Sequence, residues 1–212
     1  MPPSAQPKPP RRGRPRDPEK LRSILEAADQ QFCAHGFAGT NLDVIAQVAG
    51  VSKMTVYSYF PSKEALFSTV IGTRTGRVLG DLRGEKALDP HRPAQTLLQI
   101  GERFQALMRE EMTLSRFRIY FAASSTQPEA CRTFYEQGPE LLINDLADYL
   151  RSAHDTGALQ VAEPTMAANL FLSMFLGRGH LHAMLGLGVP TPRAEKALLK
   201  EAVRVFMAAY GR

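Results

Sequence analysis

The chain has 212 residues, of which 44% are hydrophobic and 22% charged, and its formal net charge is +5 at pH 7. This length and composition are typical of a globular protein with a substantial buried core, and they exclude a low-complexity or fibrous chain. The sequence lacks both the run of about 18 apolar residues that a membrane helix needs and the apolar segment of a secretory signal, so we expect a cytoplasmic protein.

Positive charge is concentrated at the start of the chain. Residues 1–63 hold nine Lys or Arg against five Asp or Glu, whereas the remainder hold 17 against 16. Residues 1–16 are rich in proline and basic residues, which predicts a disordered arm outside any core. Its segment Arg12-Gly13-Arg14-Pro15 resembles the AT-hook, whose arginines suit the narrow minor groove of A·T-rich DNA. A general basic tail is the alternative.

The first two helices are predicted from apolar spacing and from their caps. Apolar residues recur at steps of three and four from Asp17 onward, and Gly36 is expected to end this first helix. Its apolar face comprises Leu21, Ile24, Leu25, Ala28 and Phe32. Thr40, with Asp43 three residues later, has the pattern of a capping box, so Thr40 is expected to start a second, short helix that Gly50 ends.

The next two helices have similar signals. Ser52 is expected to cap a short helix from Lys53 to about Phe60, which Pro61 ends, and Ser62 is expected to cap the following helix. Two short helices joined by a glycine-containing turn are the outline of a helix-turn-helix.

The second helix of such a pair lies in the major groove of DNA, with its N-terminal residues nearest the base edges. Lys53, Met54 and Thr55 occupy that end, and their side chains suit contacts to bases or phosphate. Tyr57 and Tyr59 can pack their rings inside the protein while their hydroxyls bind phosphate. For these tyrosines and for Met54, packing within the protein is the alternative.

Lys63 lies in the first turn of the following helix, where it opposes the helix dipole. A phosphate bound at that helix N-terminus would account for a lysine there. Thr40 is expected to reach the other flank of the groove. The predicted DNA-binding residues are therefore Thr40, Ser52, Lys53, Met54, Thr55, Tyr57, Tyr59 and Lys63, with Arg12 and Arg14 of the arm.

The segment from Gly36 to Phe67 resembles the DNA-binding domain of the TetR family of bacterial repressors. The motifs that carry the resemblance are Gly36-Phe37, Thr40, Ile45-Ala46, Ala49-Gly50-Val51-Ser52, Tyr57, Tyr59-Phe60 and Lys63-Glu64 with Leu66. Met54 departs from the family pattern, which often has glycine there. The resemblance implies phosphate contacts from Thr40, Tyr57, Tyr59 and Lys63, and base contacts from the start of the third helix.

The rest of the chain is predicted to be helical, over residues 62–80, 92–110, 113–126, 128–155 with a break at Gly138-Pro139, 164–186 and 191–210. The fold is therefore predicted to be all-α, with a helix-turn-helix DNA-binding domain at 17–63. The resemblance implies that the helices of residues 64–212 form an effector-binding and dimerisation domain. The resemblance implies a homodimer through the last two helices, which carry more apolar surface than a monomer's exterior accommodates.

Aromatic residues of the C-terminal part suggest a pocket for an apolar small-molecule effector. They are Phe104, Phe117, Tyr120, Phe121, Phe134 and Tyr135. Ordinary core packing is the alternative for such a stripe. Around these residues the chain loosely resembles the AefR-like subgroup of the family.

An enzyme is not expected, because the sequence has no nucleophile elbow, phosphate-binding glycine loop or zinc-protease motif. No cofactor or metal site is expected either, since His180 and His182 fall on different faces of a helix. Cys33 and Cys131 lie far apart and outside any metal-binding spacing, in agreement with a reducing compartment.

These observations predict a ligand-responsive, sequence-specific DNA-binding regulator, a repressor that binds a palindromic operator as a homodimer. The first alternative is a nonspecific or architectural DNA-binding protein that relies on the arginine-rich arm. The second is a small-molecule-binding or catalytic helical protein in which the N-terminal module has lost its role.

Overall fold

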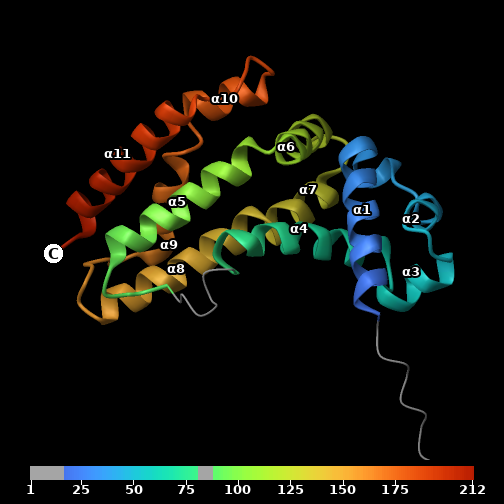
Figure 1. Cartoon of the computed structure of the whole chain (residues 1–212), viewed down its shortest axis with the longest axis horizontal. Helices are drawn as coiled ribbons and strands as arrows, with labels where there is room; N and C mark the ends of the chain where they lie inside the picture. The colour runs from blue at the N-terminus through green and yellow to red at the C-terminus, as the bar shows by residue number, and fades with distance from the viewer. Residues whose placement is uncertain (1–16, 81–87) are drawn as a thin grey trace, which may run out of the picture.

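A computed structural model describes residues 17–80 and 88–212 of the chain (Figure 1). The predicted arm, with Arg12 and Arg14, lies outside the described residues. The helices are α1 (Pro18–Gly39), α2 (Leu42–Val48), α3 (Lys53–Tyr59), α4 (Lys63–Gly80), α5 (Pro93–Arg109), α6 (Glu111–Ala123), α7 (Pro128–Gln137), α8 (Pro139–Asp155), α9 (Pro164–Ser173), α10 (Arg178–Met184) and α11 (Pro192–Tyr210). The all-α prediction is confirmed, because the described residues contain no strand beyond one isolated bridge, between Leu159 and Gly211.

Most predicted helix boundaries agree with the structure because they depend on local caps. The Ser52 hydroxyl accepts a hydrogen bond from the Thr55 amide at 3.1 Å, and the Ser62 hydroxyl accepts one from the Ala65 amide at 3.2 Å. The predicted break before Pro139 is also present, between α7 and α8.

The capping prediction for Thr40 was wrong. Asn41 caps α2 instead, since its side chain accepts from the Asp43 amide at 2.8 Å. The Thr40 hydroxyl turns back and donates to the carbonyls of Gly36 and Gln31, at 2.6 and 3.1 Å. Gly36 makes this possible, because its φ of +66° kinks the end of α1 and exposes a carbonyl to the hydroxyl.

The single helix predicted over residues 164–186 was also wrong. The chain forms α9 and α10 there, separated by a bent segment, and Gly177 precedes α10 with a non-helical backbone. Glycine disfavours the helix interior by about 1 kcal/mol relative to alanine, so continuous apolar character did not ensure a continuous helix.

The structure has two hydrophobic cores, which we call the head core and the body core. The head core joins α1, α2 and α3 to the first half of α4, and it extends to Tyr120 of α6 and Ala130 of α7. The body core is formed by α5, α8, α9 and α11. Figure 1 shows the head at one end, with α4 and α8 running side by side away from it. No helix within the described ranges is both long and apolar enough to cross a membrane.

Candidate functional site

Helix α3 is held to the head by one face only. Val56 is fully buried and Phe60 is 6% exposed, and both belong to the head core. The opposite face begins with the capping pair Ser52 and Thr55, whose side-chain oxygens lie 2.8 Å apart. Met54 between them is 77% exposed. The start of α3 is therefore held to the head core by its buried face, while its opposite face is open to solvent.

Tyr57 and Tyr59 lie on α3 but have different surroundings. Tyr57 is exposed, and its hydroxyl makes no hydrogen bond to another described residue. The Tyr59 hydroxyl accepts from the Asp17 amide at 2.8 Å and donates to the Asp17 carbonyl at 3.1 Å. Tyr59 therefore ties the end of α3 to the start of α1, whereas Tyr57 leaves a hydroxyl available to a partner.

Lys53 and Lys63 both have partners within the chain. The Lys53 ammonium lies 2.7 Å from the carboxylate of Asp43 on α2, which raises the pKa of Lys53. The Lys63 ammonium donates to the Thr40 carbonyl at 3.1 Å and lies 4.5 Å from the centre of the Phe37 ring. Lys63 thus has a structural role that sequence reasoning missed, since the partners belong to the turn that the Thr40 hydroxyl builds.

Thr40 itself does not present its side chain to the surface. It is 4% exposed and both of its hydrogen bonds lead inward. The predicted phosphate contact by this hydroxyl is therefore not available in this structure. Its contribution is indirect, because its carbonyl positions the ammonium of Lys63.

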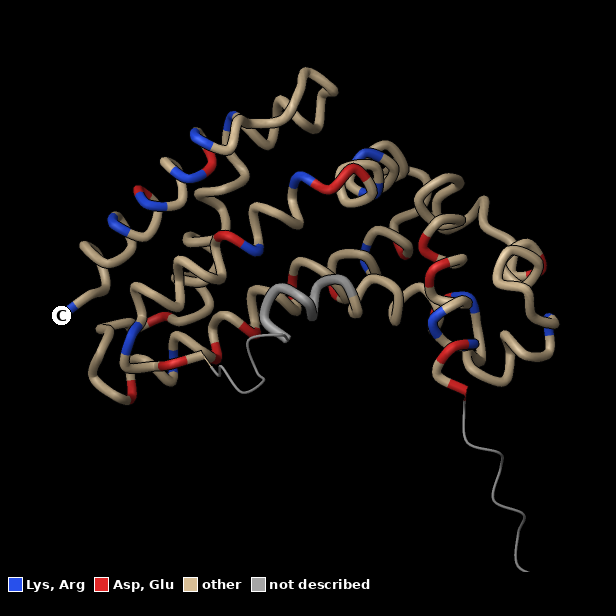
Figure 2. The backbone as a smooth tube through the Cα atoms, in the orientation of Figure 1, with Lys and Arg blue, Asp and Glu red and all other residues tan. Residues whose placement is uncertain are grey.

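The folded part of the head is not basic. Residues 17–63 hold four Lys or Arg and five Asp or Glu, whereas residues 1–16 hold five basic residues and no acidic one. Figure 2 shows positions of both signs interspersed along the described chain. The arm therefore carries the excess positive charge that sequence reasoning assigned to the first 63 residues.

A cavity of about 270 Å³ lies in the body beside the head core. Four of the six predicted pocket aromatics, Phe104, Phe117, Phe134 and Tyr135, line it. The other two do not. Tyr120 packs instead against Phe67 and stacks on Phe134, with 4.6 Å between the ring centres of Tyr120 and Phe134. Phe121 is 65% exposed. Phe117, Tyr120 and Phe121 occupy neighbouring positions on α6, three and four residues apart, but Tyr120 packs into the head core and Phe121 remains exposed.

The cavity wall includes two polar residues of α6 that sequence reasoning missed. Thr113 and Arg116 are 6% and 4% exposed. The Arg116 guanidinium pairs with the carboxylate of Asp29 on α1, which is also buried. Burial lowers the pKa of Arg116 to about 10, which leaves it cationic at neutral pH. The sequence feature that could have identified Arg116 as a cavity residue is its position on the helix face that also carries Phe117 and Tyr120.

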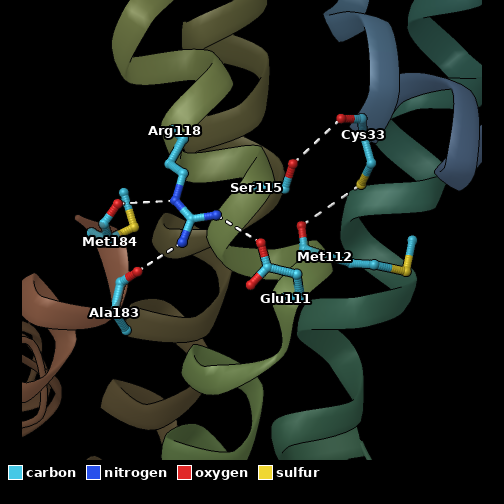
Figure 3. A network of polar contacts seen from close by, with 7 residues as sticks. All are labelled: Cys33, Glu111, Met112, Ser115, Arg118, Ala183 and Met184. Atoms are coloured by element: carbon cyan, nitrogen blue, oxygen red, sulfur yellow. Dashed lines mark hydrogen bonds and ion pairs between the residues drawn. The ribbon is translucent and has the colours of Figure 1, made fainter. Parts of the chain in front are cut away.

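Further polar contacts tie α6 to α1 and α10 (Figure 3). The Cys33 thiol of α1 lies 3.7 Å from the Met112 carbonyl, and the Ser115 hydroxyl lies 3.5 Å from the Cys33 carbonyl. The Arg118 guanidinium donates to the carbonyls of Ala183 and Met184, at 2.7 and 2.9 Å, and pairs with Glu111. Helix α6 therefore contacts the head, the cavity and α10 at once.

The described residues contain no group of three or more His, Cys, Asp or Glu that could hold a metal ion. His180 is half-buried near the Met108 carbonyl, and burial lowers its pKa. Its ring lies against Phe117, with 6.0 Å between the centres.

Comparison with known families gives two matches that together cover most of the chain. Residues 24–70 match the family described as bacterial regulatory proteins, tetR family. Residues 95–212 match the AefR-like transcriptional repressor, C-terminal domain.

Individual relatives agree with these matches. The chain is 52% identical over 146 residues to the HTH-type transcriptional regulator RutR of Escherichia coli O157:H7, a match that spans 68% of this chain and 60% of that protein. The solved structure of the flavonoid-responsive regulator FrrA is 33% identical, with a TM-score of 0.68 over 91% of this chain and 97% of its own. A TetR-family regulator structure from Mesorhizobium loti is 28% identical, with a TM-score of 0.71 over 93% of this chain and all of its own.

Proposed function

The chain belongs to the TetR family of DNA-binding bacterial transcriptional regulators, and we propose that it is a ligand-responsive, cytoplasmic repressor that binds a palindromic operator as a homodimer. In this proposal residues 17–63 bind DNA and residues 64–212 bind the effector and dimerise. The family is one of regulators rather than enzymes, so we assign no catalytic residue.

The observation that carries the proposal is the open face of α3. Val56 and Phe60 anchor the helix, while Met54 and Tyr57 are exposed at the end that a helix-turn-helix directs at base edges. The residues that we propose to contact DNA are Ser52, Lys53, Met54, Thr55, Tyr57 and Lys63, with Arg12 and Arg14 of the arm. Tyr59 is left out because its hydroxyl is held by Asp17. We expect Lys53 to exchange its pair with Asp43 for phosphate or base, because solvent screens an exposed ion pair and makes it weak.

The apolar exterior of α9, α10 and α11 supports a homodimer. Exposed large hydrophobic residues of this region are Met166, Leu170, Leu176, Leu181, Leu185, Leu187, Val189, Leu198 and Val205. Figure 1 shows α10 and α11 on the outer side of the body, where a second copy can approach. Burial of such a surface in a symmetric dimer would also place two copies of α3 for the two halves of a palindrome.

The cavity supports response to a small molecule. Its wall is mainly apolar and aromatic, as is typical of ligand sites, and it lies next to the head core. FrrA, which has a similar fold and is 33% identical, is described as flavonoid-responsive, and we propose an aromatic effector here too. A coupling of about 1–3 kcal/mol between cavity and head would change DNA affinity by about 5- to 150-fold.

The experiment that tests DNA binding through this surface is a salt titration with labelled duplex DNA. We expect Lys63→Ala to weaken binding and to reduce the slope of log affinity against log salt by about one unit. Arg151→Ala on α8 is the matched control, because it removes an exposed cation that pairs with Asp148 far from α3 in sequence. An equal slope for wild type and Lys63→Ala would remove Lys63 from the DNA-binding surface.

A further inference from the structure

Two hydrogen-bonding atoms on residues of the cavity wall are buried without partners among the described residues. They are the Thr113 hydroxyl and the Nε of Arg116. Buried polar atoms of this kind are rare, because a buried donor without a partner has lost its hydrogen bonds to water and gained none in return. Both residues are more than nine-tenths buried and lie one turn apart on α6. The pair therefore indicates a ligand group that reaches this part of the wall.

The chemistry of the wall decides what that group is. Arginine has only donors, and Arg116 is the one charged residue among the described residues that line the cavity. Tyr135, Asn169 and Ser173 also line it, but each can both donate and accept, so they do not select a charge. A cationic ligand would meet the guanidinium, whereas an acceptor, above all an anionic one, would satisfy both unpartnered atoms.

We propose that the effector is an aromatic acid whose carboxylate or phenolate accepts hydrogen bonds from Thr113 and Arg116 while its ring packs among Phe104, Phe117 and Phe134. This inference rests on the proposed function and names the chemical class of the effector. The volume of about 270 Å³ lies close to the lower end of the roughly 300–1,000 Å³ that is typical of small-molecule pockets, which favours a small aromatic acid.

The same contact links the cavity to the head. Arg116 holds Asp29 of α1 through a buried ion pair, in the middle of the first helix of the DNA-binding domain. Asp29 is bonded by a terminal nitrogen of the guanidinium, whereas the anion would accept from the unpartnered Nε. The two anions then compete for the charge of one guanidinium and repel each other, which weakens the tie between α6 and α1. A neutral aromatic ligand fills the cavity but leaves this pair unchanged.

The test is calorimetric titration of the full chain with three probes of one shape, namely 2-naphthoate, 2-naphthylmethanol and 2-naphthylmethylammonium. We expect 2-naphthoate to bind at least about tenfold more tightly than the alcohol, and the ammonium to bind least well. Equal affinities for all three probes, or no binding by any of them, would overturn the proposal. DNA binding by the protein does not depend on this outcome, so a failure here leaves the proposed function to its own test.

The variant Thr113→Val removes one donor at nearly constant volume, and we expect it to weaken 2-naphthoate binding by about five- to tenfold. Thr133→Val on α7 is the matched control, because Thr133 does not line the cavity and its hydroxyl bonds the Glu129 carbonyl. The double variant Asp29→Leu/Arg116→Met replaces the buried pair with apolar side chains and so avoids a lone buried charge. It is expected to lose the preference for the acid entirely.

Hydrogen exchange of residues 24–36 reads out the link to the head. We expect 2-naphthoate to accelerate exchange in this part of α1, and 2-naphthylmethanol to leave it unchanged. Tight binding of 2-naphthoate with no change in α1 would contradict the competition between the ligand and Asp29.

Discussion

The head and the body of this protein are both helical, but they differ in how completely their interiors are filled and in which side chains they expose. The head fills its interior, where Phe32 and Phe67 pack edge to face with 5.0 Å between ring centres, and leaves Met54 and Tyr57 of α3 exposed. The body contains a cavity of about 270 Å³ and exposes Leu181 on α10 and Leu185 and Leu187 just after it. In the proposed function, this difference gives the DNA-binding surface a rigid support and leaves the effector a space in the body.

Helix α6 belongs to both regions. It contributes Tyr120 to the head core and Thr113 to the cavity wall, and its Arg116 reaches Asp29 of α1. Helix α4 is shared as well, because Phe67 is buried in the head while Ile71 reaches the cavity. A ligand that moves α6 or α4 therefore acts on the packing of the head directly.

The largest effect is expected from breaking the contact between the two regions. Arg116→Ala removes the ion-pair partner of a buried carboxylate, and we expect the free energy of unfolding to fall by about 3–5 kcal/mol. Urea denaturation measures this change. The double variant Asp29→Leu/Arg116→Met should lie much closer to wild type, and equal losses in both would show that packing rather than charge pairing is lost.

The arm offers a second way to sharpen the comparison, because it carries charge that the folded head lacks. Deletion of residues 1–16 removes five basic residues, so we expect the salt slope of DNA binding to fall by up to about four units. The loss of affinity should be greater for sites with A·T-rich flanks than for sites with G·C-rich flanks. Equal losses on both flanks would reduce the arm to a general basic tail.

Two glycines test how differently the two regions are packed. A Cβ added at Gly101 in the body would lie 2.5 Å from Leu199 Cδ1 and 2.9 Å from Phe175 Cζ, so Gly101→Ala is expected to cost about 1–3 kcal/mol through overpacking. Gly50 in the head has open space but a φ of +67°, so Gly50→Ala is expected to cost about 1 kcal/mol through backbone strain alone. Thermal unfolding of both variants measures this, and a larger loss at Gly50 would contradict the assignment.

The smallest effects separate the two tyrosines of α3. Tyr59→Phe removes both hydrogen bonds to Asp17, and we expect about 1 kcal/mol of lost stability. Tyr57→Phe should leave stability unchanged and lower DNA affinity by several-fold, because its hydroxyl has no partner among the described residues. Denaturation and DNA titration of both variants check this, and the reverse pattern would exchange the roles of the two residues.

The sequence predicted the head well because its helices depend on local signals. Ser52 and Ser62 each cap a helix through an amide three residues later, so the local sequence was sufficient to predict where these helices start. The misassigned cap at Thr40 and the missed partner of Lys63 have one cause, the inward turn of the Thr40 hydroxyl, which depends on the kink at Gly36. The family resemblance identified the chain's class, which both family matches confirm.

The cavity was harder to predict because its polar wall depends on distant contacts. Arg116 and Asp29 are 87 residues apart, and neither belongs to a motif. The sequence indicated a set of aromatic residues that includes Phe117 and Phe134, but helical spacing could not show that Phe121 faces outward. Local periodicity states that a face is apolar, whereas the volume left between several faces depends on the packing of all of them.

The most direct test of the central claim is selection of random duplex DNA by the purified full chain at near-physiological salt. The account predicts an enriched palindrome with half-sites about one helical turn apart, because two copies of α3 read successive major grooves on one face of the duplex. Salt-sensitive retention of DNA without any enriched sequence would contradict a sequence-specific regulator and favour an architectural DNA-binding protein.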